Sequence, residues 1–166
     1  PEHTEAWRHL ADHLLATVMV VSWRFLPQSH TVVLVVDAPP EVRVGETFQM
    51  AVIVRNGSDS DTAVWTGVEV DDNYLRGYPL LSAVSSAPSW RNIDYESDSN
   101  LFEYDNIEIA PLSEKRVVFT LQADSTGTFE GWIAVLMRSH FDINFPVAHS
   151  NVRTIAVAGE RKRDVK

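Results

Sequence analysis

Five oxygen-bearing side chains between positions 94 and 105 have the types and the spacing of a loop that could bind a cation. They are Asp94, Glu96, Asp98, Asn100 and Asp105. Calcium loops place carboxylate and amide oxygens at alternate positions and need a glycine at their sharp turn. Ser99 stands where that glycine is required, and neither flank has a helical pattern. We therefore predict no metal site, and a cation, if one bound, would use Asp94, Glu96, Asp98 and Asp105.

The histidines do not form a recognisable ligand set. They are His3, His9, His13, His30, His140 and His149. Copper sites of the blue-copper type need a cysteine ligand, and the chain contains no cysteine. His140 and His149 bracket a loop-like stretch and are interpreted as surface residues. His13 borders an apolar segment, where an imidazole could contact a heme or a pigment. Because Asp12 precedes it, a position at a lipid interface is the simpler interpretation, and we predict no cofactor.

The sequence contains none of the common catalytic motifs. There is no Gly-x-Ser-x-Gly elbow, no glycine-rich phosphate loop and no His-Glu-x-x-His motif. The formal net charge of -9 argues against nucleic acid as a partner, because phosphate neutralisation needs clustered lysine and arginine. The one basic cluster lies in the tail 160–166 and is either solvated or a contact for anionic lipid or an acidic subunit. We predict a protein that is not an enzyme.

An apolar segment precedes the rest of the chain. Residues 10–26 are mostly apolar without a polar stripe, and Thr4 and Pro27 suit the start and the end of a helix. A helix that is apolar on all sides favours lipid or a deep core. We predict that residues 1–30 form a membrane anchor, with a helix packed on its own domain as the alternative. The anchor residues would be Trp7, Leu14, Leu15, Val18, Val20, Val21, Trp23 and Arg24.

The length of this segment constrains the anchor. It is shorter than the roughly 20 residues that span a bilayer, so thinning of the bilayer or polar neighbours would be needed. Asp12 and Arg24 lie near its two ends, where charged side chains can reach the interface. A short N-terminal tail commonly stays in the cytoplasm. We therefore expect the following domain on the periplasmic side of a bacterial membrane.

From Thr31 onward the apolar period changes to two, which is typical of strands. Phe48, Met50, Val52 and Val54 alternate with Gln49, Ala51, Ile53 and Arg55. Residues 129–137 form a near-continuous apolar run, as expected of a central strand. We expect Asn56 and Gly57 to form a tight turn with positive φ. We also expect the strand 63–70 to place Trp65 on the face opposite Val64, Val68 and Val70. Residues 31–159 thus predict a mainly β fold, an immunoglobulin-like antiparallel β-sandwich of about seven strands.

Two stretches carry a family resemblance. One is Val-Arg-Val-Gly-Glu-Thr-Phe at 42–48, followed by an apolar strand ending in Arg-Asn-Gly at 55–57. The other is Leu-Ser-Glu-Lys-Arg at 112–116, followed by Gly-Thr-Phe-Glu-Gly at 127–131. Both resemble bacterial immunoglobulin-like adhesion and accessory domains, over roughly residues 31–158. The resemblance implies a fold and no activity.

Residues 71–105 fit the strand pattern poorly. They hold seven acidic side chains against two arginines. They also hold six aromatic residues that we predict to contact a partner. These are Tyr74, Tyr78, Trp90, Tyr95, Phe102 and Tyr104. We interpret the region as a long insertion that forms the main binding surface. The alternative is one or two edge strands with a folded-back loop and solvated acids.

These features favour a non-catalytic accessory subunit of a membrane complex of the respiratory or photosynthetic type. Its helix would be anchored in the lipid bilayer, and its β-sandwich would brace the other membrane-complex subunits. One alternative is a cell-envelope module that binds a ligand or mediates adhesion. A second alternative is a periplasmic assembly factor.

Overall fold

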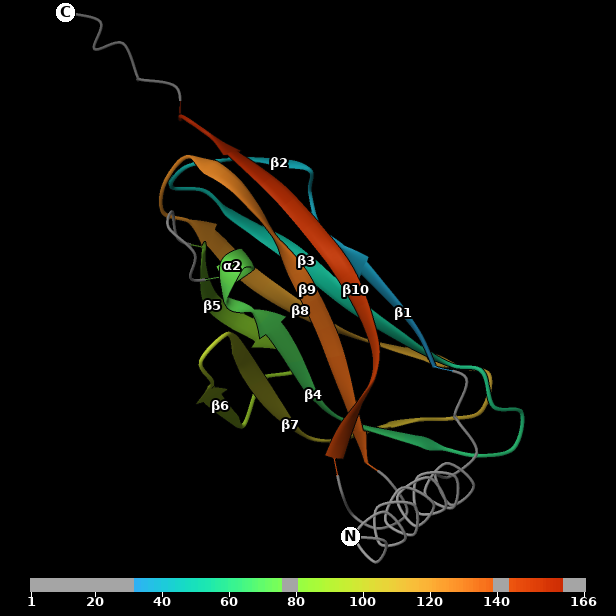
Figure 1. The fold of residues 1–166 in the computed structure, drawn as a ribbon. Coiled ribbons are helices and arrows are strands. Elements are labelled where there is room, and N and C mark those ends of the chain that lie inside the picture. The colour runs from blue at the N-terminus through green and yellow to red at the C-terminus, as the bar shows by residue number, and fades with distance from the viewer. Residues whose placement is uncertain (1–31, 76–80, 139–143, 160–166) are drawn as a thin grey trace, which may run out of the picture.

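Two β-sheets packed face to face form the part of the chain that the computed structural model describes, residues 32–75, 81–138 and 144–159 (Figure 1). One sheet contains, in spatial order, β1 (Val32–Asp37), β3 (Thr47–Asn56), β8 (Glu114–Ala123) and β5 (Leu81–Ala87). The other contains β2 (Glu41–Arg43), β10 (Asn144–Val157), β9 (Gly127–Arg138), β4 (Ala63–Asp71), β7 (Ser99–Ile109) and β6 (Asn92–Tyr95). A short helix, α2 (Asp72–Leu75), follows β4.

The pairing of these strands is antiparallel except between β2 and β10, which run parallel. The mainly β, immunoglobulin-like sandwich expected from the sequence is confirmed. The described residues contain ten strands rather than about seven, because three short or edge strands carry little apolar alternation. The predicted N-terminal helix lies outside the described residues.

Alternating apolar residues of both sheets meet in one core. The fully buried apolar residues of the two central strands of the four-stranded sheet are Met50, Val52, Val54, Val117, Phe119, Leu121 and Ala123. Burying one such side chain stabilises a fold by about 1.5–3 kcal/mol relative to exposure. The alternation along β3 and β8 therefore decides which face of this sheet points inward.

The expected alternation fails in β4, because its register shifts between Trp65 and Gly67. A β-bulge adds one residue and so reverses the faces of the residues that follow it. Trp65, Val68 and Val70 are consequently all fully buried. The indole Nε1 of Trp65 donates a hydrogen bond to the carbonyl of Gly67, 2.8 Å away. The prediction that Trp65 faces away from Val68 and Val70 is wrong.

The expected hairpin turn at Asn56 and Gly57 is also wrong. The described glycines with positive φ are Gly45, at 86°, and Gly127, at 159°, and Gly57 is not among them. The chain here crosses from β3 in one sheet to β4 in the other, so no tight turn is needed. The side chain of Asn56 is buried and its Nδ2 donates to the carbonyls of Asp61 (2.7 Å) and Ile109 (3.0 Å). The side-chain amide of Asn56 thus holds the connection between β3 and β4 in place.

The described residues of the range 71–105 belong to the sandwich, so the prediction of a long insertion does not fit them. In the described part of this region the chain forms the end of β4, then α2, β5, β6 and most of β7. β5 is an edge strand of the four-stranded sheet, and β6 is an edge strand of the six-stranded sheet. The alternative with edge strands is therefore the better description, although β7 pairs on both sides.

The two flanks of the sandwich differ. On one flank, which we call the closed flank, the chain passes from β1 in one sheet to β2 in the other and pairs there with β10 (Figure 1). Backbone hydrogen bonds join the amide of Val44 to the carbonyl of Val157 (3.0 Å) and the amide of Ile155 to the carbonyl of Pro40 (2.9 Å). On the other flank, which we call the open flank, β5 and β6 form the sheet edges.

Candidate functional site

The acidic residues of the predicted cation loop are spread along a β-hairpin. Asp94 lies on β6 opposite Leu101 of β7, and Asp105 lies four residues further along β7. At about 3.3 Å per residue, Asp105 is thus on the order of 13 Å from that position. In the described parts of the chain, no three histidine or acidic side chains gather closely enough to hold a metal ion. Asp94, Glu96, Asp98 and Asp105 therefore do not form a site, because a strand separates residues that a loop would bring together.

Three of the six aromatic residues predicted to contact a partner are core residues. Tyr74, Phe102 and Tyr104 expose 0 %, 2 % and 3 % of their surface. Burial raises the pKa of Tyr74 to about 12 and raises the pKa of Tyr104 far above its ordinary value, and hydrogen bonds partly offset both effects. The assignment of Tyr74 and Tyr104 to a binding surface is wrong, because both rings are buried in the core. Phe102 is also almost fully buried and contributes only to the lining of the groove described below. Tyr78 lies outside the described residues.

Trp90 lies on the connection between β5 and β6 and packs partly into the core. Its ring is tilted against Phe102, at 5.2 Å between centroids, and stacked on Phe119, at 6.5 Å. Near it, the hydroxyl of Tyr104 donates to Oγ of Ser86 at 3.2 Å and so links β7 to β5. Trp90 thus joins the two sheets at one end of the open flank, through its contacts with Phe102 of β7 and Phe119 of β8.

Tyr95 is the aromatic residue of this set that faces solvent, with 61 % of its surface exposed. It stands at the rim of a groove of about 300 Å³ that runs between the edge strands of the open flank. The groove is lined by Leu75, Leu81, Ser82, Ala83, Ile93, Tyr95, Asn100 and Phe102. Most of these side chains are apolar, so the groove can accept an apolar group.

The edges of the groove offer backbone groups and negative charge. β5 pairs with β8 on one side, and its pairing register shifts between Ala83 and Ser85, which leaves Val84 53 % exposed. The hairpin that joins β6 to β7 carries the exposed acids Asp94, Glu96 and Asp98. Unpaired strand edges are templates for adding another strand. The open flank therefore combines an apolar groove, strand edges and acidic surroundings.

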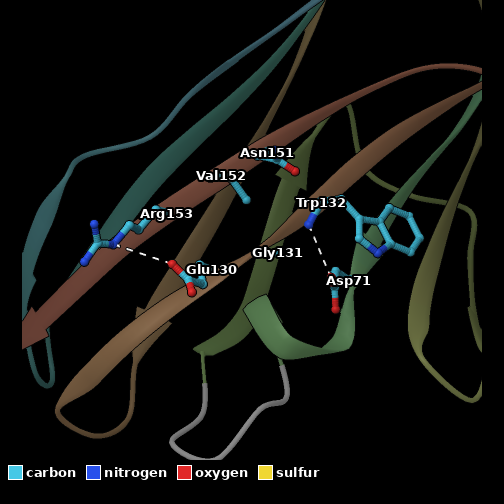
Figure 2. A pocket seen from close by; sticks show the side chains of 7 residues that line it. All are labelled: Asp71, Glu130, Gly131, Trp132, Asn151, Val152 and Arg153. Carbon is cyan, nitrogen blue, oxygen red and sulfur yellow. Dashed lines mark hydrogen bonds and ion pairs between the residues drawn. The ribbon is translucent and has the colours of Figure 1, made fainter.

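A second, shallower hollow of about 490 Å³ lies on the outer face of the six-stranded sheet. Figure 2 shows Trp132 and Asp71 on one side of it and the Glu130–Arg153 pair on the opposite side, with Asn151 and Val152 between them. The carboxylate of Glu130 is 3.7 Å from Nε of Arg153. Several hydrogen-bonding side chains thus surround one aromatic ring.

Asp71 supports both this hollow and α2. Its Oδ1 accepts from the amide of Asn73 at 2.8 Å, which caps the start of α2, and its Oδ2 accepts from the amide of Trp132 at 3.3 Å. A Cβ on residue 131 would lie 2.8 Å from Cβ of Asp71, so only glycine at position 131 allows this approach. The carboxylate is therefore a fixed structural group.

α2 connects this arrangement to the closed flank. The hydroxyl of Thr154 donates its single proton to the carbonyl of Pro39, 3.0 Å away. The hydroxyl of Tyr74, 3.0 Å from Oγ1 of Thr154, must therefore be the donor of their shared hydrogen bond. On the other side of α2, Leu75 lines the groove.

The predicted anchor cannot be placed in the sandwich. Trp7, Leu14, Leu15, Val18, Val20, Val21, Trp23 and Arg24 lie outside the described residues, as does His13. Among the described residues there is no helix of the length and apolar character that a membrane crossing requires. His149 is exposed on β10, and His140 lies outside the described residues.

Two features of these hollows were not predicted from the sequence: the groove residues on the edge strands and the orientation of Trp132. Ala83 and Ile93 line the groove from edge strands whose short apolar runs gave little signal. The apolar run 129–137 predicts a central strand around Trp132, which is confirmed, but the run itself does not indicate the direction of the ring. Its neighbours two positions apart, Glu130 and Ala134, include a charged residue, whereas Phe129 and Ile133 are buried. This alternation already indicates that Trp132 faces outward.

No protein-family model and no curated protein matches the chain. The CARDB domain of a Pyrococcus furiosus protein, solved with di-metal ions, is 14% identical, with a TM-score of 0.45, over 80% of this chain and 90% of that one. A cohesin module from a Clostridium perfringens family 33 glycoside hydrolase is 13% identical, with a TM-score of 0.48, over 77% and 98%. A non-cellulosomal cohesin from Archaeoglobus fulgidus is 9% identical, with a TM-score of 0.48, over 76% and 91%. None of these likenesses identifies a function for the chain.

Proposed function

We propose that this chain is a non-catalytic protein-binding module that holds an extended segment of a partner protein on its open flank. One observation carries the proposal. The groove between β5 and β6 is apolar, opens at two strand edges and has Tyr95 on its rim, 61 % exposed. Large exposed aromatic rings beside apolar hollows are typical anchors of protein interfaces.

The chemistry of the groove defines the partner segment. Leu81, Ala83 and Ile93 would contact an apolar side chain of the partner, while the edge of β5 or β6 pairs with its backbone. Asp94, Glu96 and Asp98 surround the same flank and favour lysine or arginine next to that apolar residue. The expected partner segment is therefore extended, with one or two apolar residues flanked by basic residues.

We further propose that the module is an accessory subunit of a membrane complex, held on the periplasmic side by the apolar segment 10–26. The support is the sequence of that segment, which is apolar on all sides, and the acidic, cysteine-free composition of the chain. In this role the groove would brace another subunit of the complex.

The test is purification of the tagged full chain from its native membrane in mild detergent. Stoichiometric co-purification of other subunits is expected, together with a loss of at least fivefold in their yield for Tyr95→Ala. A matched control is Val33→Thr, because Val33 is 46 % exposed on β1, on the closed flank. Recovery of the native chain as a free monomer, or equal loss with both variants, would refute the proposal.

A further inference from the structure

The hollow in Figure 2 has features that the proposed protein-binding role does not use. It lies on the outer face of the six-stranded sheet and is built from β9, β10 and the end of β4. Trp132 points to this face, so its ring is not needed to fill the core, where Ile133 and Phe129 from the same strand are buried. The ring of Trp132 is half-buried, so part of it stays accessible to a ligand that can stack on an indole.

The register of β9 and β10 arranges the polar groups. Trp132 lies directly opposite Asn151, and Glu130 lies directly opposite Arg153. Directly opposed side chains have Cβ atoms about 4.5–5.5 Å apart, and the two rows are about 7 Å apart along the strands. An indole, an amide, a carboxylate and a guanidinium therefore occupy one compact area of a rigid sheet.

This area is pre-organised. Asp71 is held by the amides of Asn73 and Trp132 and forms a fixed border of the hollow. Glu130 and Arg153 pair at 3.7 Å but remain 71% and 63% exposed, so both keep hydrogen-bonding capacity toward a ligand. The amide of Asn151, which both donates and accepts, is exposed beside the ring.

The chemistry of these groups selects a class of ligand. Phosphate is disfavoured, because Arg153 is already paired with Glu130 and Asp71 adds a second carboxylate. A lipid tail or a drug-like apolar molecule is disfavoured, because the hollow is open and four of its seven lining residues carry charged or amide side chains. A pyranose ring has an apolar face of C–H groups that can stack on an indole, and a rim of hydroxyl groups that donate and accept.

We propose that the hollow bordered by Trp132, Asn151, Glu130, Arg153 and Asp71 is a carbohydrate-binding site. The sugar ring stacks on Trp132, and its hydroxyl groups bond to Asn151 and to the Glu130–Arg153 pair. The shallow shape suits a residue within a polysaccharide chain, which needs open ends on both sides. The site is separate from the open flank and does not depend on the proposed function.

Native gel electrophoresis of the full chain in detergent, through gels that contain a neutral soluble polysaccharide, tests the proposal. The probes are hydroxyethyl cellulose, arabinoxylan, glucomannan and glycol chitin. Retardation by at least one is expected, with a dissociation constant raised fivefold or more by Trp132→Ala and partly restored by Trp132→Phe. Because the ligand is neutral, the affinity should change little between 50 mM and 300 mM salt, where a charge-based contact would weaken.

Tyr95→Ala is the control, and it should bind the polysaccharide as the native chain does while losing protein partners. This result separates the sugar site from the groove, so that either can fail alone. If circular dichroism shows that Trp132→Ala is unfolded, Asn151→Ala and Glu130→Gln take its place, with the same expected loss. No retardation by any of the four polysaccharides, or retardation that a folded variant of this hollow leaves unchanged, overturns the proposal.

Discussion

The closed flank and the open flank of this sandwich hold the two sheets together in different ways. On the closed flank the chain itself crosses between the sheets, and hydrogen bonds from Val44, Ile155 and Thr154 hold the crossing segment against β10. On the open flank the sheet edges are joined by side chains, through the ring of Trp90 and the bond from Tyr104 to Ser86. The comparison teaches that a flank held by side chains can leave room for a groove.

The same comparison gives α2 a particular position. Tyr74 ties it to the closed flank, and Leu75 places it at the groove of the open flank. A structural change at either flank is thus expected to shift α2 and, through it, residues of the other flank. The following substitutions test the difference between the flanks, beginning with the largest expected effect.

Replacing Trp90 should damage the open flank most. Trp90→Ala removes a partly buried ring from contact with Phe102 and Phe119, and we expect the free energy of unfolding to fall by about 3 kcal/mol. Urea unfolding followed by circular dichroism measures this. Trp90→Phe should recover more than half of the loss. A loss below about 0.5 kcal/mol would show that the ring of Trp90 does not hold the two sheets together at this flank.

Gly131→Ala should strain the support of α2. The added Cβ would lie 2.8 Å from Cβ of Asp71, so Asp71 must move and its hydrogen bonds to Asn73 and Trp132 must weaken. We expect a loss of about 2 kcal/mol in the free energy of unfolding. Gly159→Ala is the control, since its Cβ would come only to 3.4 Å of the carbonyl of Val44. Equal effects of the two variants would contradict the assignment.

Alkaline pH should weaken the closed flank through Tyr74. Its pKa is about 12 in the folded chain, because the buried ring disfavours the charged form, and about 10 when unfolded. Because the pKa of Tyr74 is higher in the folded chain, its contribution to the free energy of unfolding is fully present below pH 10. This contribution is lost as the pH rises toward 12. At pH 11 the loss should be about 1 kcal/mol. Urea titrations at pH 8, 10 and 11 measure it, and Tyr74→Phe should reduce the slope; an identical slope would argue against this cause.

Tyr95→Ala should have the smallest effect on stability. The ring is 61 % exposed, so we expect a change in the free energy of unfolding below about 0.5 kcal/mol. Thermal or urea unfolding measures it beside the binding assay described above. A loss of 2 kcal/mol or more would mean that Tyr95 belongs to the core of the open flank, and its effect on binding could no longer be separated from folding.

Parts of this fold follow directly from the order of the residues. The alternation of Met50, Val52 and Val54 with other residues, flanked by Gln49 and Arg55, predicts β3. Gly45, which follows Val42 and Val44, is typical of a turn, and its φ is 86°. Such features depend on local chemistry alone, so they can be deduced without knowing what packs on what.

Other parts depend on contacts between distant segments. The bulge at Trp65 reverses a face because β7 and β9 impose their register on β4. Gly57 forms no hairpin because its strands belong to different sheets. The sequence around Phe102 suggests a loop, but β7 pairs with β4 on one side and with β6 on the other, so Phe102 lies in the middle of a sheet. The aromatic content of residues 71–105 drew attention to the region that contains Tyr95, but it could not indicate which rings point outward.

The parallel pairing of β2 with β10 has a mechanical consequence. Residue 32 lies near the Asn56 end of β3, whereas Val157 lies beside Arg43, so the chain enters the sandwich at one end and leaves at the other. Tension applied between the two ends pulls β2 and β10 lengthwise past each other, and the bonds between them share the load and must break together. The sandwich can therefore transmit a pulling force along its length without peeling open one bond at a time.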